Sequence, residues 1–343
     1  MENRVHWLDS ARAIAIMLVV FTHAHERSGD LPYYIKSIFY SIDRIGVPIF
    51  FMISGGLLIP KLSNIDILTF YKNKIPKFIF LLSFYTIITN VIFFVLDGVS
   101  FTDAFTKSII DFNAIFNTKE KIGIYGHARQ MWFMYSIIGI YLIAPFLSKI
   151  LTNSETKDIL IFFTVCVLLN QFRLTMRYYF GSINSFDRIG IEMTGSYISY
   201  FIIGYVIINR IKVVKCGYVT LFLTAIIPPV ILLLTEMKTE RFDWIIHWYA
   251  GSIYILISSI SVFLIIKKFF HNKNIKLLNI LSKYSFGIYL IHYAMIFVVL
   301  KVISLESVGQ YSMMIIIFSL TIVLSVIYCN IISKNKLTKK YLM

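Results

Sequence analysis

Residues 311–332 read YSMMIIIFSLTIVLSVIYCNII, a run of 22 positions without one Asp, Glu, Lys or Arg. A helix needs about 20 apolar residues to cross the hydrocarbon core of a bilayer, so this run is long enough to span it. Nine further apolar stretches precede it, at about 8–25, 45–60, 76–96, 131–148, 159–170, 194–209, 217–235, 250–266 and 285–303. The sequence therefore predicts an all-α, polytopic transmembrane bundle of about ten helices.

The composition excludes most other classes of protein. Apolar residues make up 58% of the 343 positions and charged residues 15%, which is too hydrophobic for a soluble or a disordered chain. A β-barrel would show short alternating segments instead of long continuous ones. The three cysteines are scattered, so we expect neither a disulfide framework nor a metal site. Because there is no internal repeat or polar linker, we predict one domain over residues 1–343.

The net charge of +15 is distributed in a way that predicts the topology. With a cytoplasmic N-terminus, the inner segments hold 19 Lys and Arg and four acidic residues, whereas the outer loops hold equal numbers of basic and acidic residues. This asymmetry is what the positive-inside rule describes, and it predicts both termini in the cytoplasm. The basic residues flank membrane segments and form no continuous patch, so we expect contacts with membrane lipids and none with nucleic acid.

The first apolar stretch contains the ionisable residues Asp9, Arg12 and His23, which are costly in a membrane. Arg12 and His23 are eleven residues apart, which is about 1100° of helical rotation and a rise of roughly 16 Å. They therefore share one face of the helix. Asp9 precedes Arg12 by three positions, and we expect the two to form an ion pair at the cytoplasmic end. The alternative is that Arg12 snorkels to the membrane surface and His23 caps the helix.

Further candidate site residues lie in other helices. Arg44 precedes the second apolar stretch, and His127, Arg129 and Trp132 precede or open the fourth, which places all four at the outer level of His23. Trp132 is also typical of an aromatic belt at the membrane surface. His292 lies within the ninth stretch, where a hydrogen-bonded core histidine is the simpler interpretation.

Taken together, these segments resemble the acyltransferase-3 family of integral membrane acyltransferases over nearly the whole chain. The resemblance rests on Trp7-Leu8-Asp9 with the Arg-x10-His spacing of Arg12 and His23, on residues 44–55, 131–135 and 141–145, on Gly204-Tyr205 and on residues 285–292. The chain is most similar to the short bacterial branch, of the enterobacterial common antigen O-acetyltransferase type, that O-acetylates cell-surface polysaccharides. It departs from the family in having Ala11-Arg12-Ala13 where Leu-Arg-Gly is usual and Gly56 where a larger residue is common.

The resemblance implies acetyl-CoA as the acyl donor, a hydroxyl of a free or lipid-linked saccharide as the acceptor, and the bacterial inner membrane as the location. His23 would serve as the general base or as a transient carrier of the acyl group. Arg44 or Arg129 would stabilise developing negative charge. Arg12 would help to dock the CoA phosphates at the basic inner face, with Asp9, His127, Arg129, Trp132 and His292 in supporting roles. The exact sugar, the transfer of acetyl or succinyl, and the oligomeric state stay open.

Two interpretations from other classes compete with this one. A transporter or flippase of lipid-linked saccharides also contains buried charges and many helices, but the sequence shows no pair of interrupted helices or two-half symmetry. A structural partner of a polysaccharide synthase is the third possibility. The spacing of His25 and Asp30 matches the His-x4-Asp motif of glycerolipid acyltransferases, but six residues in a polar loop match easily by chance.

Overall fold

The computed structural model describes residues 5–110, 127–181, 197–303 and 308–343. Over these ranges the chain forms helices and no β-strand, which confirms the prediction of an all-α protein. Nine of the described helical segments are long and apolar enough to cross a membrane. The protein is a multi-pass integral membrane protein.

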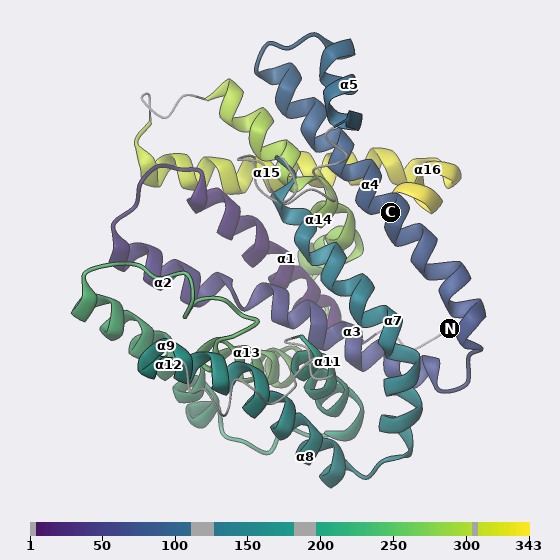
Figure 1. Ribbon diagram of the computed structural model, residues 1–343, viewed down its shortest axis with the longest axis vertical. Coiled ribbons are helices and arrows are strands. Elements are labelled where there is room, and N and C mark those ends of the chain that lie inside the picture. The colour runs from purple at the N-terminus through teal and green to yellow at the C-terminus, as the bar shows by residue number, and fades with distance from the viewer. Residues whose placement is uncertain (1–4, 111–126, 182–196, 304–307) are drawn as a thin grey trace. The chain divides into compact units, whose positions relative to one another are not determined.

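Each described span contains all or most of one predicted stretch, and several spans begin or end about ten residues beyond it (Figure 1). The spans are α1 (His6–Glu26), α2 and α3 (Tyr33–Asp43 and Gly46–Leu62), α4 (Ile67–Leu96), η1 and α7 (Arg129–Met131 and Trp132–Asn153), α8, η2 and α9 (Thr156–Val167, Leu168–Phe172 and Arg173–Phe180), α12 (Tyr218–Thr239), α13 (Ile253–Phe270), α14 (Lys276–Val302) and α15 (Gln310–Lys334). The sixth predicted stretch, 194–209, begins outside the described residues and continues as α11 (Ile198–Tyr205) and η4 (Val206–Arg210). Two short helices, α5 (Phe101–Ile110) and α16 (Lys336–Leu342), complete the described structure.

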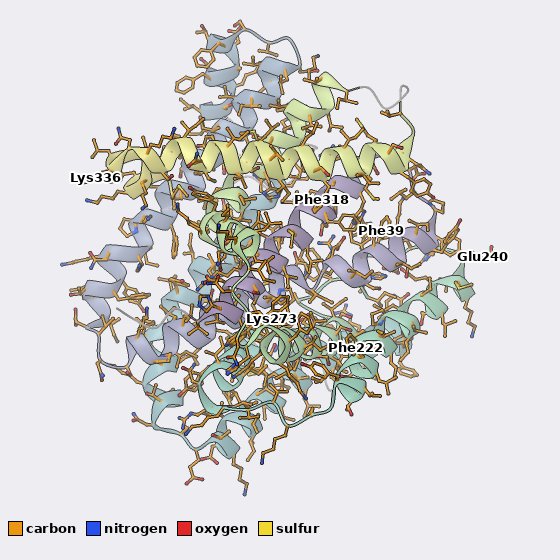
Figure 2. All side chains as sticks on the ribbon, turned by 180° about the vertical axis from the view of Figure 1, so that it is seen from behind. Phe39, Phe222, Glu240, Lys273, Phe318 and Lys336 are labelled. Carbon is orange, nitrogen blue, oxygen red and sulfur yellow. The ribbon has the colours of Figure 1, made fainter. Side chains whose placement is uncertain are left out.

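Local signals begin and end several of these helices. The side chain of Asp66 accepts a hydrogen bond of 2.8 Å from the Thr69 N–H and so caps the start of α4. Ser252 caps α13 through the Ile255 N–H in the same way. Glu240, at the end of α12 (Figure 2), has a φ of 51° and closes that helix in the left-handed conformation.

The chain divides into two compact units. Unit 1 comprises Met1–Thr22, Leu31–Ile65 and Ile143–Ser282, and unit 2 comprises His23–Asp30, Asp66–Leu142 and Lys283–Met343. Three of the boundaries between them fall inside continuous helices, namely α1 (between Thr22 and His23), α7 and α14. The interpretation as a single domain stays a prediction.

In unit 1, α3 packs against α11 at very close range (Figure 1). A Cβ atom added at Gly55 would overlap the main-chain carbonyl of Phe201, and one added at Gly204 would overlap that of Met52. Small residues of this kind allow membrane helices to approach closely enough for their backbones to touch. The neighbouring Gly56 faces Ile208 of η4, whose side chain occupies the space that a larger residue at position 56 would need. The family resemblance leads one to expect a larger residue at position 56, and in this chain the Ile208 side chain fills that space instead.

Two helices of unit 1, α12 and α13, lie side by side. Ser261 donates a hydrogen bond of 2.8 Å to Thr224, and Ser258 donates one to the main-chain oxygen of Ala225. Apart from its contacts with α13 and α2, α12 presents apolar side chains to the surroundings, among them Phe222, which is 51% exposed (Figure 2). A surface of exposed apolar side chains is expected where a helix contacts lipid.

Unit 2 has its core between α14, α15 and the end of α1. Its buried residues are Ala24, Tyr293, Ile296, Phe297, Val299, Met313 and Ile317. Phe318 of α15 (Figure 2) packs against this cluster from its edge. The C-terminal α16 is tied to α4 by the hydroxyl of Tyr85, which donates to the main-chain oxygen of Leu342 at 2.8 Å. This core surrounds the last turn of α1, where His23 lies.

Candidate functional site

The last turn of α1 places a histidine beside a carboxylate. Nδ1 of His23 lies 2.8 Å from Oε2 of Glu26, three residues further along the helix. Because a carboxylate oxygen only accepts hydrogen bonds, Nδ1 carries the hydrogen, and Nε2 of the neutral ring keeps its lone pair. Both side chains are mostly buried, with exposed fractions of 15% and 22%. This arrangement can orient an imidazole as a base and stabilise its protonated form.

A second histidine stacks on the first. The rings of His23 and His292 have centroids 5.4 Å apart and an interplanar angle of 24°. His292 is fully buried, and its Nδ1 lies 2.7 Å from the main-chain oxygen of Tyr289, to which it donates. Its Nε2 has no hydrogen-bond partner among the residues that the structure describes. His292 is therefore a buried neighbour of His23, and the sequence placed both in the candidate site.

The next residue along α14, Tyr293, completes the surroundings of His23. Its ring stands nearly perpendicular to the His23 ring, with centroids 5.0 Å apart. Nη2 of Arg27 donates a hydrogen bond of 2.8 Å to the Tyr293 hydroxyl. The Arg27 guanidinium also lies over the rings of Tyr293 and Phe297, at 5.6 and 5.7 Å from their centroids. His23, in the last turn of α1, and Arg27, directly after that helix, thus both contact α14.

Of the predicted residues near the fourth stretch, His127 is connected to this cluster by ring contacts. Its ring stacks on Phe93 with centroids 3.5 Å apart, and Phe93 in turn contacts Phe297, a neighbour of Tyr293. The main-chain N–H of His127 donates to Asn90. His127 therefore lies at the edge of the aromatic environment of His23.

The other two predicted residues of this region lie elsewhere in unit 2. Arg129 is exposed at the start of η1. Trp132 begins α7, and its ring packs edge-on against Phe133 with centroids 6.0 Å apart. Roles in catalysis for these two residues stay predictions.

The predicted ion pair of Asp9 and Arg12 is confirmed. Nη1 of Arg12 lies 3.3 Å from Oδ1 of Asp9, and the same oxygen accepts a hydrogen bond of 2.7 Å from Ser282. The helix α1 runs without a break from His6 to Glu26, so the spacing of eleven residues keeps Arg12 and His23 on one face of it. The Arg12 side chain is 30% exposed.

Arg44, the other predicted catalytic residue, belongs to unit 1 and connects α2 to α3. Four aromatic rings surround its guanidinium, with centroids 4.7 to 5.8 Å away: Tyr40, Trp244, Trp248 and Tyr249. Cation–π contacts of this kind hold an arginine in place within an apolar environment. A role for Arg44 in stabilising negative charge stays a prediction.

Sequence reasoning missed three residues of this arrangement, namely Glu26, Arg27 and Tyr293. Glu26 and Arg27 follow His23 by three and four positions, the spacings at which helical side chains meet, so the sequence did contain a signal for them. Tyr293 follows directly after His292, but nothing in its local sequence indicates that its hydroxyl meets Arg27.

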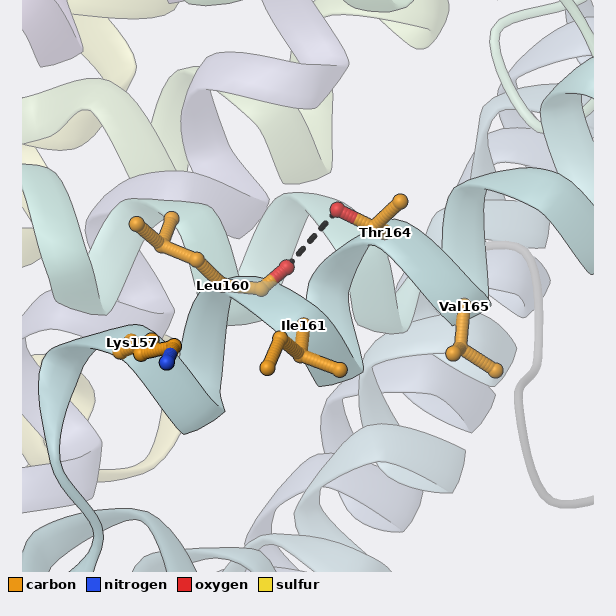
Figure 3. A pocket seen from close by; sticks show the side chains of 5 residues that line it. All are labelled: Lys157, Leu160, Ile161, Thr164 and Val165. Carbon is orange, nitrogen blue, oxygen red and sulfur yellow. Dashed lines mark hydrogen bonds between the residues drawn. The ribbon is translucent and has the colours of Figure 1, made fainter.

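A surface depression of about 560 Å³ lies on α8 in unit 1 (Figure 3). It is lined by Lys157, Leu160, Ile161, Thr164 and Val165, all from that one helix, and Figure 3 shows the hydroxyl of Thr164 bound to the main-chain oxygen of Leu160. None of the predicted site residues lines it. Its lining has one amine, one hydroxyl that is already bonded to the helix backbone, and otherwise apolar side chains, so it offers no arrangement of groups for chemistry.

A family model described as an acyltransferase domain matches residues 5–333. The chain belongs to the acyltransferase-3 family. It is therefore a membrane acyltransferase, and an acyl donor and an acyl acceptor are implied by its family. The family resemblance seen in the sequence is confirmed at this level. No curated protein and no solved structure matches the chain significantly.

Proposed function

We propose that this acyltransferase moves an acetyl group from acetyl-CoA to a hydroxyl of a cell-surface or lipid-linked saccharide in the bacterial inner membrane. The observation that carries the proposal is the hydrogen bond between His23 and Glu26. Transfer from a thioester to a hydroxyl requires a base for the hydroxyl proton, stabilisation of negative charge and exclusion of water. His23 in the last turn of α1 can serve as the base, and its mostly buried position supports the exclusion of water.

His23 would act as the general base. Because Glu26 holds the hydrogen on Nδ1, the lone pair of Nε2 can take the proton of the acceptor hydroxyl as its oxygen attacks the thioester carbonyl. The carboxylate of Glu26 would then stabilise the imidazolium that forms. Transient acylation of His23 itself is the alternative course, and the same tautomer would present Nε2 as the nucleophile.

Arg12 would bind the acyl donor on the cytoplasmic side. A guanidinium suits phosphate recognition because its planar set of N–H groups matches phosphate oxygens. The rise along α1 from Arg12 to His23 is roughly 16 Å, which is comparable to an extended pantetheine arm. The CoA phosphates would therefore dock near Arg12 while the acetyl group reaches His23.

Mass spectrometry of the surface glycan tests this function. Deletion of the gene should leave glycan chains that are exported and lack acetate, and the wild-type gene should restore the acetate. A gene for His23→Ala, expressed to the same level, should not restore it. Loss of glycan export in the deletion strain would instead favour a flippase, and unchanged acetate content would contradict the proposal.

A further inference from the structure

We propose that the hydroxyl of Tyr293, polarised by Arg27, is a catalytic hydrogen-bond donor that stabilises the oxyanion formed on the thioester carbonyl oxygen. The inference rests on the proposed function and adds two residues to that site. Neither residue was expected from the sequence, where Arg44 or Arg129 was predicted to take the role.

The direction of the hydrogen bond between Arg27 and Tyr293 is the first support. A guanidinium only donates, so the Tyr293 oxygen accepts at 2.8 Å and its own O–H remains available to donate to a third group. A positive charge on the oxygen's other side draws electron density from the hydroxyl and strengthens it as a donor. The pair therefore presents a polarised O–H group.

The charge state of Arg27 is the second support. Within the part of the chain that the structure describes, its contacts are the Tyr293 hydroxyl and the rings of Tyr293 and Phe297, and no carboxylate pairs with it. The side chain is half-buried. A cation in that setting can compensate negative charge that develops on a substrate, because no protein carboxylate already neutralises it.

The location of Tyr293 is the third support. Its ring contacts the His23 ring directly, with centroids 5.0 Å apart, and is only 2% exposed. The surrounding residues of the unit 2 core, such as Ile296 and Phe297, are apolar. Hydrogen bonds to a developing charge are stronger in such a water-poor environment than in water.

In the transfer reaction, His23 moves the proton and Tyr293 stabilises the charge on the carbonyl oxygen. The acceptor hydroxyl gives its proton to Nε2 of His23 while its oxygen bonds to the carbonyl carbon, and the carbonyl π electrons move onto the carbonyl oxygen. The Tyr293 O–H donates a hydrogen bond to this oxyanion. The intermediate then collapses, the C–S bond breaks with its electron pair on sulfur, and the protonated His23 gives its proton to the thiolate.

The experiment measures transfer of labelled acetyl from acetyl-CoA to mild-alkali-deacetylated surface glycan by the purified full-length protein in nanodiscs. Tyr293→Phe keeps the ring and removes the hydroxyl. We expect kcat to fall about 100-fold, as for the loss of one oxyanion donor, with the KM for acetyl-CoA changed less than about threefold. Tyr328→Phe is the matched control, because this hydroxyl of unit 2 pairs with Tyr85 and lies outside the His23 cluster.

A double-mutant cycle tests whether Arg27 acts through Tyr293. Arg27→Met should lower kcat about tenfold in the wild-type background and less than about twofold in the Tyr293→Phe background. Independent, multiplicative effects of the two changes would overturn the proposal, and so would an unchanged kcat for Tyr293→Phe. If Tyr293→Phe does not fold, the comparison of Arg27→Met with Arg27→Lys decides, because lysine keeps the cation and a donor. Equal losses of kcat in those two variants would then overturn it.

The two proposals fail in different ways. If the wild-type protein transfers no acetyl group to the glycan, the proposed function is wrong and the oxyanion role is wrong with it. If the wild-type protein is active and Tyr293→Phe has the wild-type kcat, only the oxyanion role is wrong.

Discussion

His23 and Glu26 lie one helical turn apart at the end of α1, with Nδ1 of the histidine 2.8 Å from Oε2 of the glutamate. The hydrogen bond fixes which ring nitrogen holds the hydrogen, and the carboxylate makes a positive charge on the ring less costly. Because both residues belong to the same turn, the helix itself brings the two side chains together. The consequences for activity can be tested at each partner separately.

We expect His23→Ala to abolish acetyl transfer while the protein still inserts and folds. Glu26→Gln should lower kcat roughly 10- to 100-fold, because the amide keeps the size of the side chain but no longer stabilises the imidazolium. The measurement is single-variant kinetics in detergent or nanodiscs, with Glu240→Gln at the exposed end of α12 as the control. Near-normal transfer by well-folded His23→Ala protein would rule out its catalytic role.

Arg12→Lys separates donor binding from simple snorkelling. If the guanidinium binds a phosphate, the change should raise the KM for acetyl-CoA roughly 10- to 100-fold, which corresponds to about 1.5–3 kcal/mol for a charge-assisted contact, and kcat should change less. If the pair with Asp9 is only structural, Arg12→Lys and Asp9→Asn should both reduce the amount of folded protein. Unchanged kinetics with normal yield would exclude phosphate docking at Arg12.

His292→Ala should have a milder effect on chemistry than His23→Ala. The His292 ring is fully buried, so its removal leaves a cavity, and we expect a lower melting temperature and a smaller yield of folded protein. Transfer per folded molecule should fall by no more than about tenfold, the lower end of the range for a residue that orients a functional group, because His292 stacks on His23 and its Nδ1 bonds to the main chain. A complete loss of transfer in folded His292→Ala protein would show that His292 takes part in the reaction itself.

Because α3 and α11 are in such close contact, we expect the addition of a single methyl group between them to lower the stability of the protein severely. Gly55→Ala should destabilise the protein by about 3 kcal/mol, because the added Cβ overlaps the Phe201 carbonyl and the two helices must separate. Gly139→Ala is the control, since a Cβ at Gly139 meets nothing within 4 Å. Size-exclusion profiles and thermal melts of the two detergent-solubilised variants compare them directly. Equal stability of both variants would contradict the close contact.

The C-terminus should lie in the cytoplasm. Lys334, Lys336, Lys339 and Lys340 cluster after the last span and favour the inner side of the membrane. A fluorescent protein fused after Met343 should therefore be bright, and an alkaline phosphatase fusion at the same site should be inactive. The reverse result would overturn the predicted topology and the placement of His23 in the outer half of the membrane.

Local sequence was sufficient for most of the fold. Lengths of apolar runs predicted the membrane helices because the bilayer imposes the same length requirement on each one, whatever its neighbours are. The ion pair of Asp9 and Arg12 was predictable because it depends only on helical spacing. Tyr33–Asp43 was not among the predicted stretches, because its sequence mixes polar and apolar residues and does not stand out in a search for continuous apolar runs.

The site itself was only half predictable. His23 and Arg12 could be proposed because an ionisable residue in an apolar helix stands out in the sequence, and Glu26 was within reach of the same helical reasoning. The stacking of His292 on His23 and the bond from Arg27 to Tyr293 join the end of α1 and the residue after it to α14, across more than 260 residues. Such contacts depend on which helices pack together and at what rotation, and side-chain packing decides this between segments that are all equally apolar. Helical periodicity shows which face of a helix carries the ionisable residues, whereas only the tertiary structure shows which residues of other helices contact that face.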